Sequence, residues 1–418
     1  MNTYQVQKLI NTGIDKLTGF DIDAALRRSL VFDFYSRQQI EDYQTQHLQK
    51  LLKIASCSDY YKPFAGKNLG NFPHMSREEY SKHYEQLITN YNTVYYLRRS
   101  SGSTGSPVRH QVTREMLLAK RVSHLKMLHW YGLSRESTEC KIGGMPADLK
   151  TRLYYRLKNK LYFNSHIIND IHFPELVRRY NTFNPMVLYG YPSMLQRFVI
   201  MAHKAGVELR SPEIVVTHAE NLYAEYLETF HDFFPEAKIV NQYWATEGNI
   251  AETCPKGNLH IAEDTVICEV LNKGNDGTGD LYLTNLFSYR VPIIRYKTGD
   301  RIKLSSKPCS CGRNTRIIEK IEGREIEYLE LPDGRRHPVT AIYLTSYTRN
   351  ILTYQLVHYR KEKKVVLNYI PVRENESIER DHIYRHMKEK FGLHTEFSAT
   401  GELHRTTGGK VKRLIVAD

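Results

Sequence analysis

Five short segments of the sequence combine glycine, hydroxyl and charged side chains in ways that suit chemistry on a phosphate group. The first, residues 100–107 (SSGSTGSP), is flanked by Arg98, Arg99 and Arg109. Glycines let backbone amides turn toward a ligand, hydroxyls donate to phosphate oxygens, and arginines supply positive charge. The segment predicts a triphosphate-binding loop, although it lacks the Gly-Lys-Ser/Thr ending of a Walker loop. The alternative is a flexible connector, which is also rich in serine and glycine.

Two further segments end apolar stretches in a carboxylate. Thr246 and Glu247 follow a strand-like run within residues 241–248 (NQYWATEG), and Asp300 ends the run 291–300 (VPIIRYKTGD). A carboxylate beside a hydroxyl can hold magnesium against a phosphate, because hard cations take oxygen ligands. Asp300 can accept hydrogen bonds from ribose hydroxyls. Taken alone, the first pair would be an ordinary helix start and the second segment a turn.

The last two segments are basic. Arg324 follows Gly323, and Lys410 follows Gly408 and Gly409 near the carboxyl terminus. A lysine on a flexible tail can move into a site and neutralise charge at a phosphorus atom. The alternatives are an ordinary turn with a solvated arginine and a solvated basic tail.

Cysteine and histidine residues form a second candidate site. Cys309 and Cys311 make a tight pair before a Gly-Arg dipeptide, and Cys254 and His260 lie upstream. Three thiolates and one imidazole suit structural zinc, which prefers a tetrahedral set of sulfur and nitrogen ligands. We interpret the four residues as a zinc site; ordinary buried thiols are the alternative.

Strand-like and helical patterns alternate through the middle of the chain. Residues 185–189 and 213–217 are rich in β-branched and apolar residues, whereas 193–206 and 223–234 have helical periodicity. This alternation predicts an α/β core with a parallel sheet. Short strands and turns after Leu259 predict a β-rich subdomain.

The two ends of the chain have patterns of their own. An amphipathic pattern predicts helix through residues 21–56, and Ser76 is a predicted cap for another helix. The last ninety or so residues predict two strands, 354–359 and 364–369, followed by a helix, 379–391. These elements predict a small α+β domain.

Composition and charge limit the classes of protein to which this chain can belong. The chain has 418 residues, of which 41% are hydrophobic and 25% charged, values typical of a globular protein with more than one domain. No apolar run is long enough to span a bilayer, and the first twenty residues do not resemble a signal peptide, so we expect a cytoplasmic location. The formal charge of +13 suits phosphorylated substrates. Lysine and arginine are scattered and no nucleic-acid-binding motif is present, so no nucleic acid partner is expected.

The order and spacing of the five segments closely resemble the adenylate-forming superfamily of acyl-CoA synthetases, peptide-synthetase adenylation domains and luciferases. The likeness spans nearly the whole chain and is strongest to the phenylacetate-CoA ligase branch, which includes capsular-polysaccharide-biosynthesis proteins. Residues 189–193 (YGYPS), 218–220 (HAE) and 279–286 (GDLYLTNL) support it. The resemblance implies a large ATP- and acid-binding domain, residues 1–324, and a small mobile α+β domain, residues 325–418, that carries the catalytic lysine.

The resemblance also implies a role for each site residue. Thr246 would contact the α-phosphate and Glu247 would bind magnesium. Lys410 would bridge the attacking carboxylate and the α-phosphate, then leave when the small domain rotates. Relatives in this branch carry a similar cysteine pair before Gly-Arg, which supports zinc. The residues that would bind ATP or AMP are Ser101, Gly102, Ser103, Thr104, Gly105, Ala219, Glu220, Tyr243, Asp300 and Arg324.

The implied reaction uses ATP and magnesium to adenylate a carboxylic acid, by in-line attack on phosphorus, before the acyl group passes to CoA. An amine, a sugar or a carrier protein is the alternative acceptor, as would suit capsule biosynthesis. Tyrosines at 131, 189, 191 and 243 favour an aryl or arylacetic acid; an amino acid or short hydroxy acid is the second choice. Homodimerisation is left open.

An inactive nucleotide-binding protein is the competing class of function. The joint presence of Glu247, Asp300, Arg324 and Lys410 argues against it, because a binding module has little need for a mobile lysine. The hinge between the domains also departs from the family pattern. The usual aspartates after Gly-Arg are replaced by Ile326 and Glu327, which leaves Glu327 and Asp333 as alternative pivots.

Overall fold

A computed structural model describes most of the chain. The described residues are 3–93, 95–99, 109–143, 149–164, 173–324, 328–332, 334–338, 351–371, 378, 380–404, 411–412 and 414–417. Ser101, Gly102, Ser103, Thr104, Gly105, Lys410 and both hinge candidates lie outside these ranges. The chain groups into two compact units: unit 1 is Met1–Glu136 with Val240–Arg324, and unit 2 is Ser137–Ile239 with Glu325–Asp418. The predicted division into domains 1–324 and 325–418 stays a prediction.

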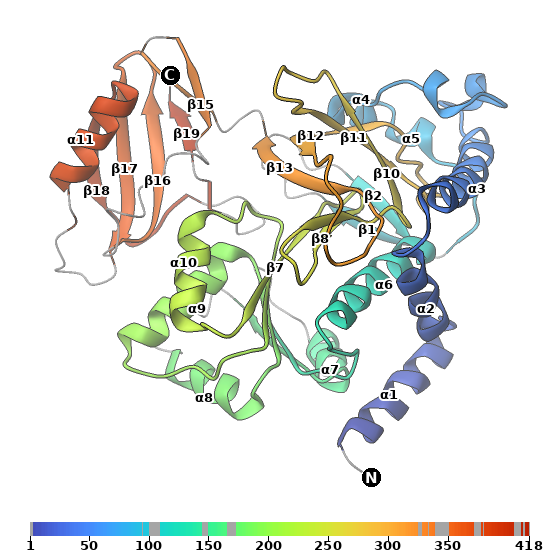
Figure 1. The fold of residues 1–418 in the computed structure, drawn as a ribbon, viewed down its shortest axis with the longest axis horizontal. Helices are drawn as coiled ribbons and strands as arrows, with labels where there is room; N and C mark the ends of the chain where they lie inside the picture. Colours follow the sequence, from blue (N-terminus) through green and yellow to red (C-terminus); the bar gives the residue numbers. More distant parts are fainter. Residues whose placement is uncertain are drawn as a thin grey trace. The chain divides into compact units, whose positions relative to one another are not determined.

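Unit 1 combines the amino-terminal helices with an antiparallel sheet (Figure 1). The sheet has the strand order β10-β11-β12-β13-β9-β8-β7, and every pair of neighbours is antiparallel. Its buried core includes Ile250, Val266, Leu281 and Leu283. The β-rich region predicted after Leu259 is therefore confirmed. The elements of unit 1 are α1 (Thr3–Thr18), α2 (Ile22–Phe32), α3 (Arg37–Ala55), α4 (Arg77–Lys82), α5 (Tyr84–Leu87), α6 (Arg114–Trp130), the 3-10 turns Lys62–Phe64 and Leu69–Asn71, and strands β1 (Tyr95–Arg99), β2 (Arg109–Thr113), β7 (Lys238–Trp244, from Val240), β8 (Asn249–Thr253), β9 (Leu259–Ile261), β10 (Val266–Leu271), β11 (Gly279–Asn285), β12 (Tyr296–Leu304) and β13 (Ile317–Arg324).

The helix predicted over residues 21–56 is two helices, and the prediction of unbroken helix is wrong. Helix α2 ends at Phe32, and α3 starts after Ser36, which forms a capping box with Gln39. In the break, the Asp33 carboxylate accepts hydrogen bonds from Lys126 and from the Trp130 indole, both on α6. A reciprocal cap satisfies the first amides of a new helix. The predicted Ser76 cap is confirmed, because Ser76 and Glu79 form the same kind of box at α4.

Unit 2 contains a parallel sheet covered by helices, and a second sheet formed by the end of the chain. The first sheet has the order β6-β5-β3-β4, all parallel, and β5 is buried along its whole length. This confirms the α/β alternation predicted from residues 185–234. The elements are β3 (Glu139–Gly143), α7 (Leu149–Leu157), β4 (Lys160–Asn164), α8 (Phe173–Phe183), β5 (Val187–Gly190), α9 (Pro192–Lys204), β6 (Ile214–His218) and α10 (Ala224–Phe233).

The carboxyl-terminal sheet has its own hydrophobic core. Its strand order is β18-β17-β16-β19, with a central antiparallel pair and parallel outer pairs, and α11 covers one face (Figure 1). Leu356 and Leu367 on the strands cluster with Ile383 and Met387 on α11. The two strands and the helix predicted here are confirmed. The elements are β14 (Tyr328–Glu330), β15 (Arg336–Pro338), β16 (Ile351–Tyr359), β17 (Lys364–Pro371), α11 (Arg380–Phe391), β18 (His394–Ala399) and β19 (Leu414–Ala417).

Within the described part of the chain, the helices are all too short or too polar to cross a bilayer.

Candidate functional site

The predicted phosphate loop joins two strands that pair with each other. Strands β1 and β2 are antiparallel, and Arg99 is the register partner of Arg109. Residues 100–108 between them lie outside the described residues. The residues on either side of this segment are therefore held next to each other by the hydrogen bonds between β1 and β2.

Three residues predicted to bind the nucleotide come together in unit 1. The Tyr243 hydroxyl donates a hydrogen bond to Oδ2 of Asp300, at 2.5 Å. Asp300 lies on β12 opposite Arg324 on β13, so their backbones are register partners. The Asp300 amide also donates to Oγ1 of Thr298, at 3.1 Å. Residues widely separated in the sequence thus meet near the ends of β7 and β13 and the middle of β12.

Glu247 lies in the turn between β7 and β8, beside a buried histidine. Its Oε1 is 3.7 Å from Nε2 of His110, a residue of β2 whose side chain is 1% exposed. Asn285 holds the Glu247 backbone by donating to its carbonyl, at 2.7 Å. Thr246 is partly exposed in the same turn, which the bond from the Ala245 amide to the Gly248 carbonyl closes. The backbone of the predicted magnesium ligand is therefore held in place, and its carboxylate lies close to His110.

Sequence reasoning missed His110 and its partner Tyr80. The Tyr80 hydroxyl is 3.3 Å from Nδ1 of His110, and the two rings stack with centroids 5.2 Å apart. Burial lowers the pKa of His110, with Glu247 opposing the shift, and burial raises the pKa of Tyr80 well above its usual value. His110 stands between Arg109 and Gln111, so no apolar pattern around it marked it in the sequence.

Ala219 and Glu220, which are predicted to border the adenine, lie in unit 2 directly after β6. Oε1 and Oε2 of Glu220 accept hydrogen bonds from the hydroxyl and the amide of Ser193, both at 3.1 Å, so this carboxylate caps the start of α9. Ala219 has a φ of 62°, in the left-handed region that costs a residue with a Cβ on the order of 1–3 kcal/mol. Such strain is typical of functional segments.

An aromatic group surrounds the ends of the parallel strands in unit 2. The Tyr189 and His218 rings stack with centroids 4.5 Å apart, and Tyr191 meets His218 edge-on at 4.9 Å. Ligands of open α/β sheets bind beyond the carboxyl ends of the strands. Tyr189 and Tyr191, suggested from the sequence as neighbours of an acid, lie at that end of β5.

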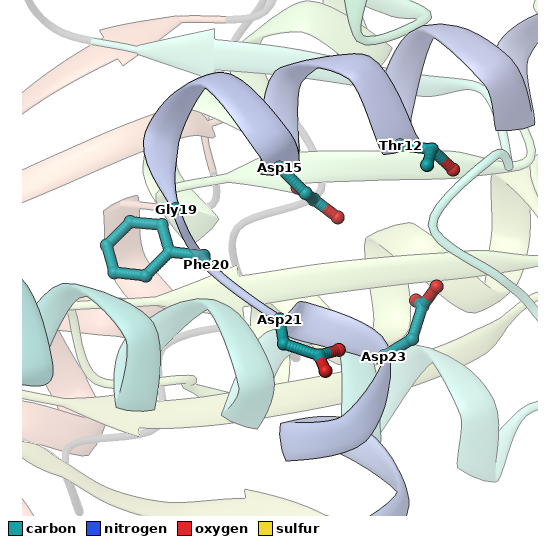
Figure 2. Close-up of a pocket in the computed structure, with 6 residues that line it drawn as sticks. All are labelled: Thr12, Asp15, Gly19, Phe20, Asp21 and Asp23. Atoms are coloured by element: carbon teal, nitrogen blue, oxygen red, sulfur yellow. The ribbon is translucent and has the colours of Figure 1, made fainter.

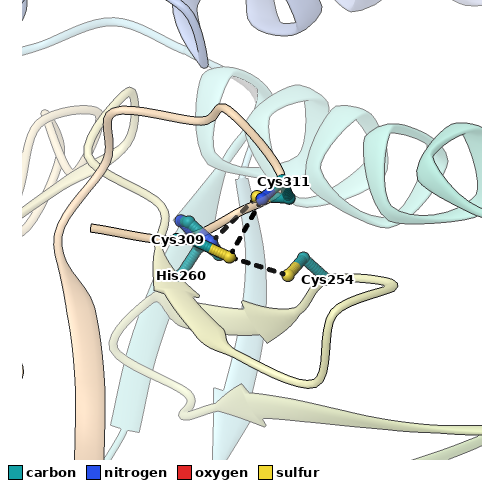
Figure 3. A group of neighbouring side chains, drawn as sticks. All are labelled: Cys254, His260, Cys309 and Cys311. Atoms are coloured by element: carbon teal, nitrogen blue, oxygen red, sulfur yellow. Dashed lines mark hydrogen bonds between the residues drawn. The ribbon is translucent and has the colours of Figure 1, made fainter. Parts of the chain in front are cut away.

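The four predicted zinc ligands form one cluster in unit 1 (Figure 3). Their ligand atoms, three sulfurs and one ring nitrogen, all lie within 4.8 Å of one another. Sγ of Cys254 is 3.7 Å from Sγ of Cys309, and Sγ of Cys311 is 3.4 Å from Nε2 of His260. This donor set and its spacing fit a tetrahedral zinc ion.

Groups behind the cluster orient its ligands. Nδ1 of His260 contacts the hydroxyl of Thr315, at 3.0 Å, which leaves Nε2 facing Cys311. Burial lowers the pKa of His260 to about 4, so the imidazole is neutral and its lone pair can bind a metal. Burial raises the pKa of Cys254 to about 12, a shift that a bound divalent cation would reverse. Outer partners of this kind are a regular feature of metal sites.

The loop that carries Cys309 and Cys311 is attached to the break between α2 and α3. The Asn314 amide donates to the Asp33 carbonyl, at 2.8 Å. The Arg313 guanidinium lies 4.4 Å from the Trp130 ring centroid, and its Nε is 3.4 Å from the Asp33 carboxylate. These contacts explain why the chain breaks its helix at Asp33.

A pocket of about 350 Å³ lies between α1 and α2 (Figure 2). Arg135 pairs with Asp15 at 2.7 Å and with Asp23 at 3.0 Å, so two of the pocket's carboxylates are neutralised. None of the residues predicted to bind ATP, magnesium or zinc lines it. The lining residues are Thr12, Asp15, Gly19, Phe20, Asp21 and Asp23.

A buried carboxylate near the candidate site predicts a pH effect on stability. Burial raises the pKa of Glu252 from 4.5 to about 8, against the opposing charge of Lys126. The folded state therefore holds this proton more tightly than the unfolded chain does, and the resulting stability is present below pH 4.5 and lost as pH rises through 8. We expect the Tm of Glu252→Gln, relative to that of the unsubstituted chain, to rise between pH 5 and 8. A difference in Tm that stays constant over this range would contradict the assignment.

Comparison with known proteins adds sequence relatives. No protein-family model matches the chain. Protein CapK of Staphylococcus aureus is 22% identical over 369 residues, which cover 84% of this chain and 80% of CapK. A phenylacetate-coenzyme A ligase of Thermus thermophilus is 28% identical over 271 residues, 56% of this chain and 60% of the ligase. The names of both relatives agree with the resemblance that the motifs indicated.

Solved structures share the fold. A 2-hydroxyisobutyryl-CoA ligase in the postadenylation state matches 92% of this chain and 91% of its own, with a TM-score of 0.74 and 14% identity. An anthranilate CoA ligase in complex with anthranoyl-AMP matches 75% of this chain and 65% of its own, with a TM-score of 0.52 and 14% identity. The sequence relatives and the shared fold agree with the resemblance first seen in the five segments, and the chain has the fold of these adenylate-binding CoA ligases.

Proposed function

We propose that the protein is an ATP-dependent, AMP-forming ligase that adenylates a carboxylic acid and passes the acyl group to CoA. The observation that carries this proposal is the meeting of Tyr243, Asp300 and the Arg324 backbone on three strands of one sheet. A tyrosine beside a carboxylate offers a flat face for a base and acceptors for ribose hydroxyls. The similar ligases bound to acyl-adenylates support the same reaction class.

The residues have distinct tasks in this proposal. Glu247 would hold magnesium, which would supply positive charge next to the phosphate groups. Thr246, in the same turn, contacts the α-phosphate. Ser101, Ser103 and Thr104, with Gly102 and Gly105 allowing the turn, hold the β- and γ-phosphates. Lys410 neutralises charge between the attacking carboxylate and the α-phosphate.

The proposal also specifies the class of carboxylic acid and the acyl acceptor. Tyr189, Tyr191 and His218 offer flat faces that favour an aryl or arylacetic acid, and the similarity to a phenylacetate-coenzyme A ligase supports this choice. CoA is the first acceptor, since a similar ligase is known in complex with CoA. Transfer to an amine, a sugar or a carrier protein, as would suit capsule biosynthesis, is the alternative.

Pyrophosphate release tests the proposal. The protein is incubated with ATP, magnesium and one acid at a time from aryl, fatty, amino, hydroxy and sugar-derived classes, without CoA. Release that depends on one acid class supports adenylation and identifies the substrate class. Adding CoA then separates the acceptors, because only a CoA ligase converts the acyl-AMP to a thioester. ATP binding without release for any acid would favour the inactive nucleotide-binding protein and overturn the proposal.

The same proposal includes a structural zinc ion held by Cys254, His260, Cys309 and Cys311. The donor set, the burial of three of the four residues and the hydrogen bond behind His260 support it. A structural site has its coordination positions filled by protein ligands, and this cluster supplies four.

A further inference from the structure

We propose that His110 is a positioning residue for the magnesium carboxylate of Glu247, and that Tyr80 sets the tautomer of His110 for this task. The inference rests on the proposed function, because it assumes that Glu247 holds the metal. Ligand carboxylates of metal sites are oriented by hydrogen bonds from groups behind them. The side chains of His110 and Tyr80 occupy that position behind Glu247.

His110 is a polar side chain in an otherwise apolar place. It is buried on β2, and within the described residues its Nε2 has no partner within hydrogen-bond distance. That nitrogen faces Oε1 of Glu247 at 3.7 Å, slightly beyond a hydrogen bond. Leaving a buried N–H unsatisfied costs roughly 1–3 kcal/mol. The arrangement is therefore poised for a small movement of the Glu247 side chain that would complete the bond.

The tautomer follows from the two neighbours of the ring. If Nε2 carries the proton, it donates toward the Glu247 carboxylate, and Nδ1 accepts from the Tyr80 hydroxyl, 3.3 Å away. If Nδ1 carried the proton, the Nε2 lone pair would face a carboxylate oxygen, which is repulsive. Tyr80 is fully buried and keeps its hydroxyl proton, so it can serve as the donor. Both contacts favour the Nε2–H form.

The position of His110 also links the metal carboxylate to the phosphate loop. His110 follows Arg109, the residue at which β2 leaves the loop, and its register partner on β1 is Arg98. A donor on this strand therefore fixes Glu247 relative to the base of the loop that the proposed function assigns to the β- and γ-phosphates. Magnesium bound to both would need this spacing to be constant.

A packing role for His110 is the competing explanation, because its ring stacks on Tyr80. Two substitutions separate the roles. His110→Phe keeps an aromatic ring in the stack and removes the donor. His110→Gln loses the ring, but its amide can donate to Glu247 and its carbonyl can accept from Tyr80. Positioning predicts that glutamine preserves metal binding and phenylalanine does not, whereas packing predicts the reverse.

The experiment measures binding of Mn²⁺ in the presence of ATP, by electron paramagnetic resonance, with no acid added. We expect His110→Phe to weaken Mn²⁺ binding about 10- to 100-fold. We expect His110→Gln to stay near the unsubstituted protein, and Tyr80→Phe to lose about two- to tenfold through the missing hydrogen bond. Thermal unfolding of each variant checks that the fold is retained. If His110→Phe fails to fold, the Tyr80→Phe and His110→Gln results decide.

Equal Mn²⁺ affinities in His110→Phe and the unsubstituted protein would overturn this inference, as would weaker binding in His110→Gln than in His110→Phe. Both results leave adenylation untouched, because pyrophosphate release by the unsubstituted protein tests that proposal separately. Conversely, Mn²⁺ and ATP binding that depends on His110, without adenylation of any acid, would support the inference about the metal site and overturn the proposed reaction.

Discussion

Lys410→Ala is expected to lower acid-dependent pyrophosphate release on the order of a hundredfold or more. In-line attack on the α-phosphate brings two anionic groups together, and one preorganised positive group at that place is worth about this much. The measurement is the initial rate of pyrophosphate release with ATP, magnesium and the best acid of the panel. ATP affinity should change little, because the lysine acts mainly on charge that develops during the reaction.

Lys412→Ala is the matched control for Lys410. It removes the same charge two positions further along the same basic tail, and the Lys412 backbone, bonded to Gln355 at 2.7 Å, stays in place. The control should keep most of its activity. Thioester formation from supplied acyl-AMP and CoA should also survive in Lys410→Ala, because in the proposed mechanism the lysine leaves before that step. Equal rates for Lys410→Ala and Lys412→Ala would show that the tail contributes only general positive charge.

Cys309→Ser is expected to release the zinc ion and to lower the Tm by roughly 5–10 °C. Structural zinc binding contributes directly to folding, and a loss of a few kcal/mol shifts the Tm of a domain of this size by about 2–4 °C per kcal/mol. Cys309 is central to the cluster, since its sulfur contacts both Cys254 and the Asn258 amide. Metal content by elemental analysis and thermal unfolding are measured on the same preparation, purified without chelator.

Cys57→Ser is the control for the loss of a thiol, because Cys57 is exposed and is not among the four clustered residues. It should keep both the metal and the Tm. A chelator should lower the Tm of the unsubstituted protein and leave Cys309→Ser unchanged. An undenatured protein with less than about one-tenth of a zinc ion per chain would leave the four residues as ordinary buried thiols.

Local patterns in the sequence were sufficient to predict many of the helices and strands. The alternation around residues 185–234 predicted β5, α9, β6 and α10, because periodicities of 2 and 3.6 are properties of short windows. The Ser76 cap was equally readable, since a capping box spans four residues. The cluster of candidate zinc ligands could be predicted because the Cys309–Cys311 pair is local and the chain has only six cysteines.

Contacts between distant segments were not readable in the same way. The break at Asp33 depends on Lys126, on Trp130 and on the loop that carries Cys309 and Cys311. None of these lies near Asp33 in the sequence. The helical pattern continues through the break, where the Ser36–Gln39 capping box is a local signal for the start of α3. Glu220 is another case: no sign in the sequence indicated that its carboxylate accepts hydrogen bonds from Ser193 at the start of α9, and its proximity to the adenine stays a prediction.

The sequence by itself determined which residue types are present for phosphate, magnesium and zinc chemistry and in what order they occur. Only the tertiary structure decided which of them meet. Asp300 faces Arg324 and Tyr243 because strands β12, β13 and β7 have a particular register and order. His110 reaches Glu247 because β2 and the turn after β7 come together. Such pairings depend on the burial and hydrogen bonding of whole strands, which a window of neighbouring residues does not encode.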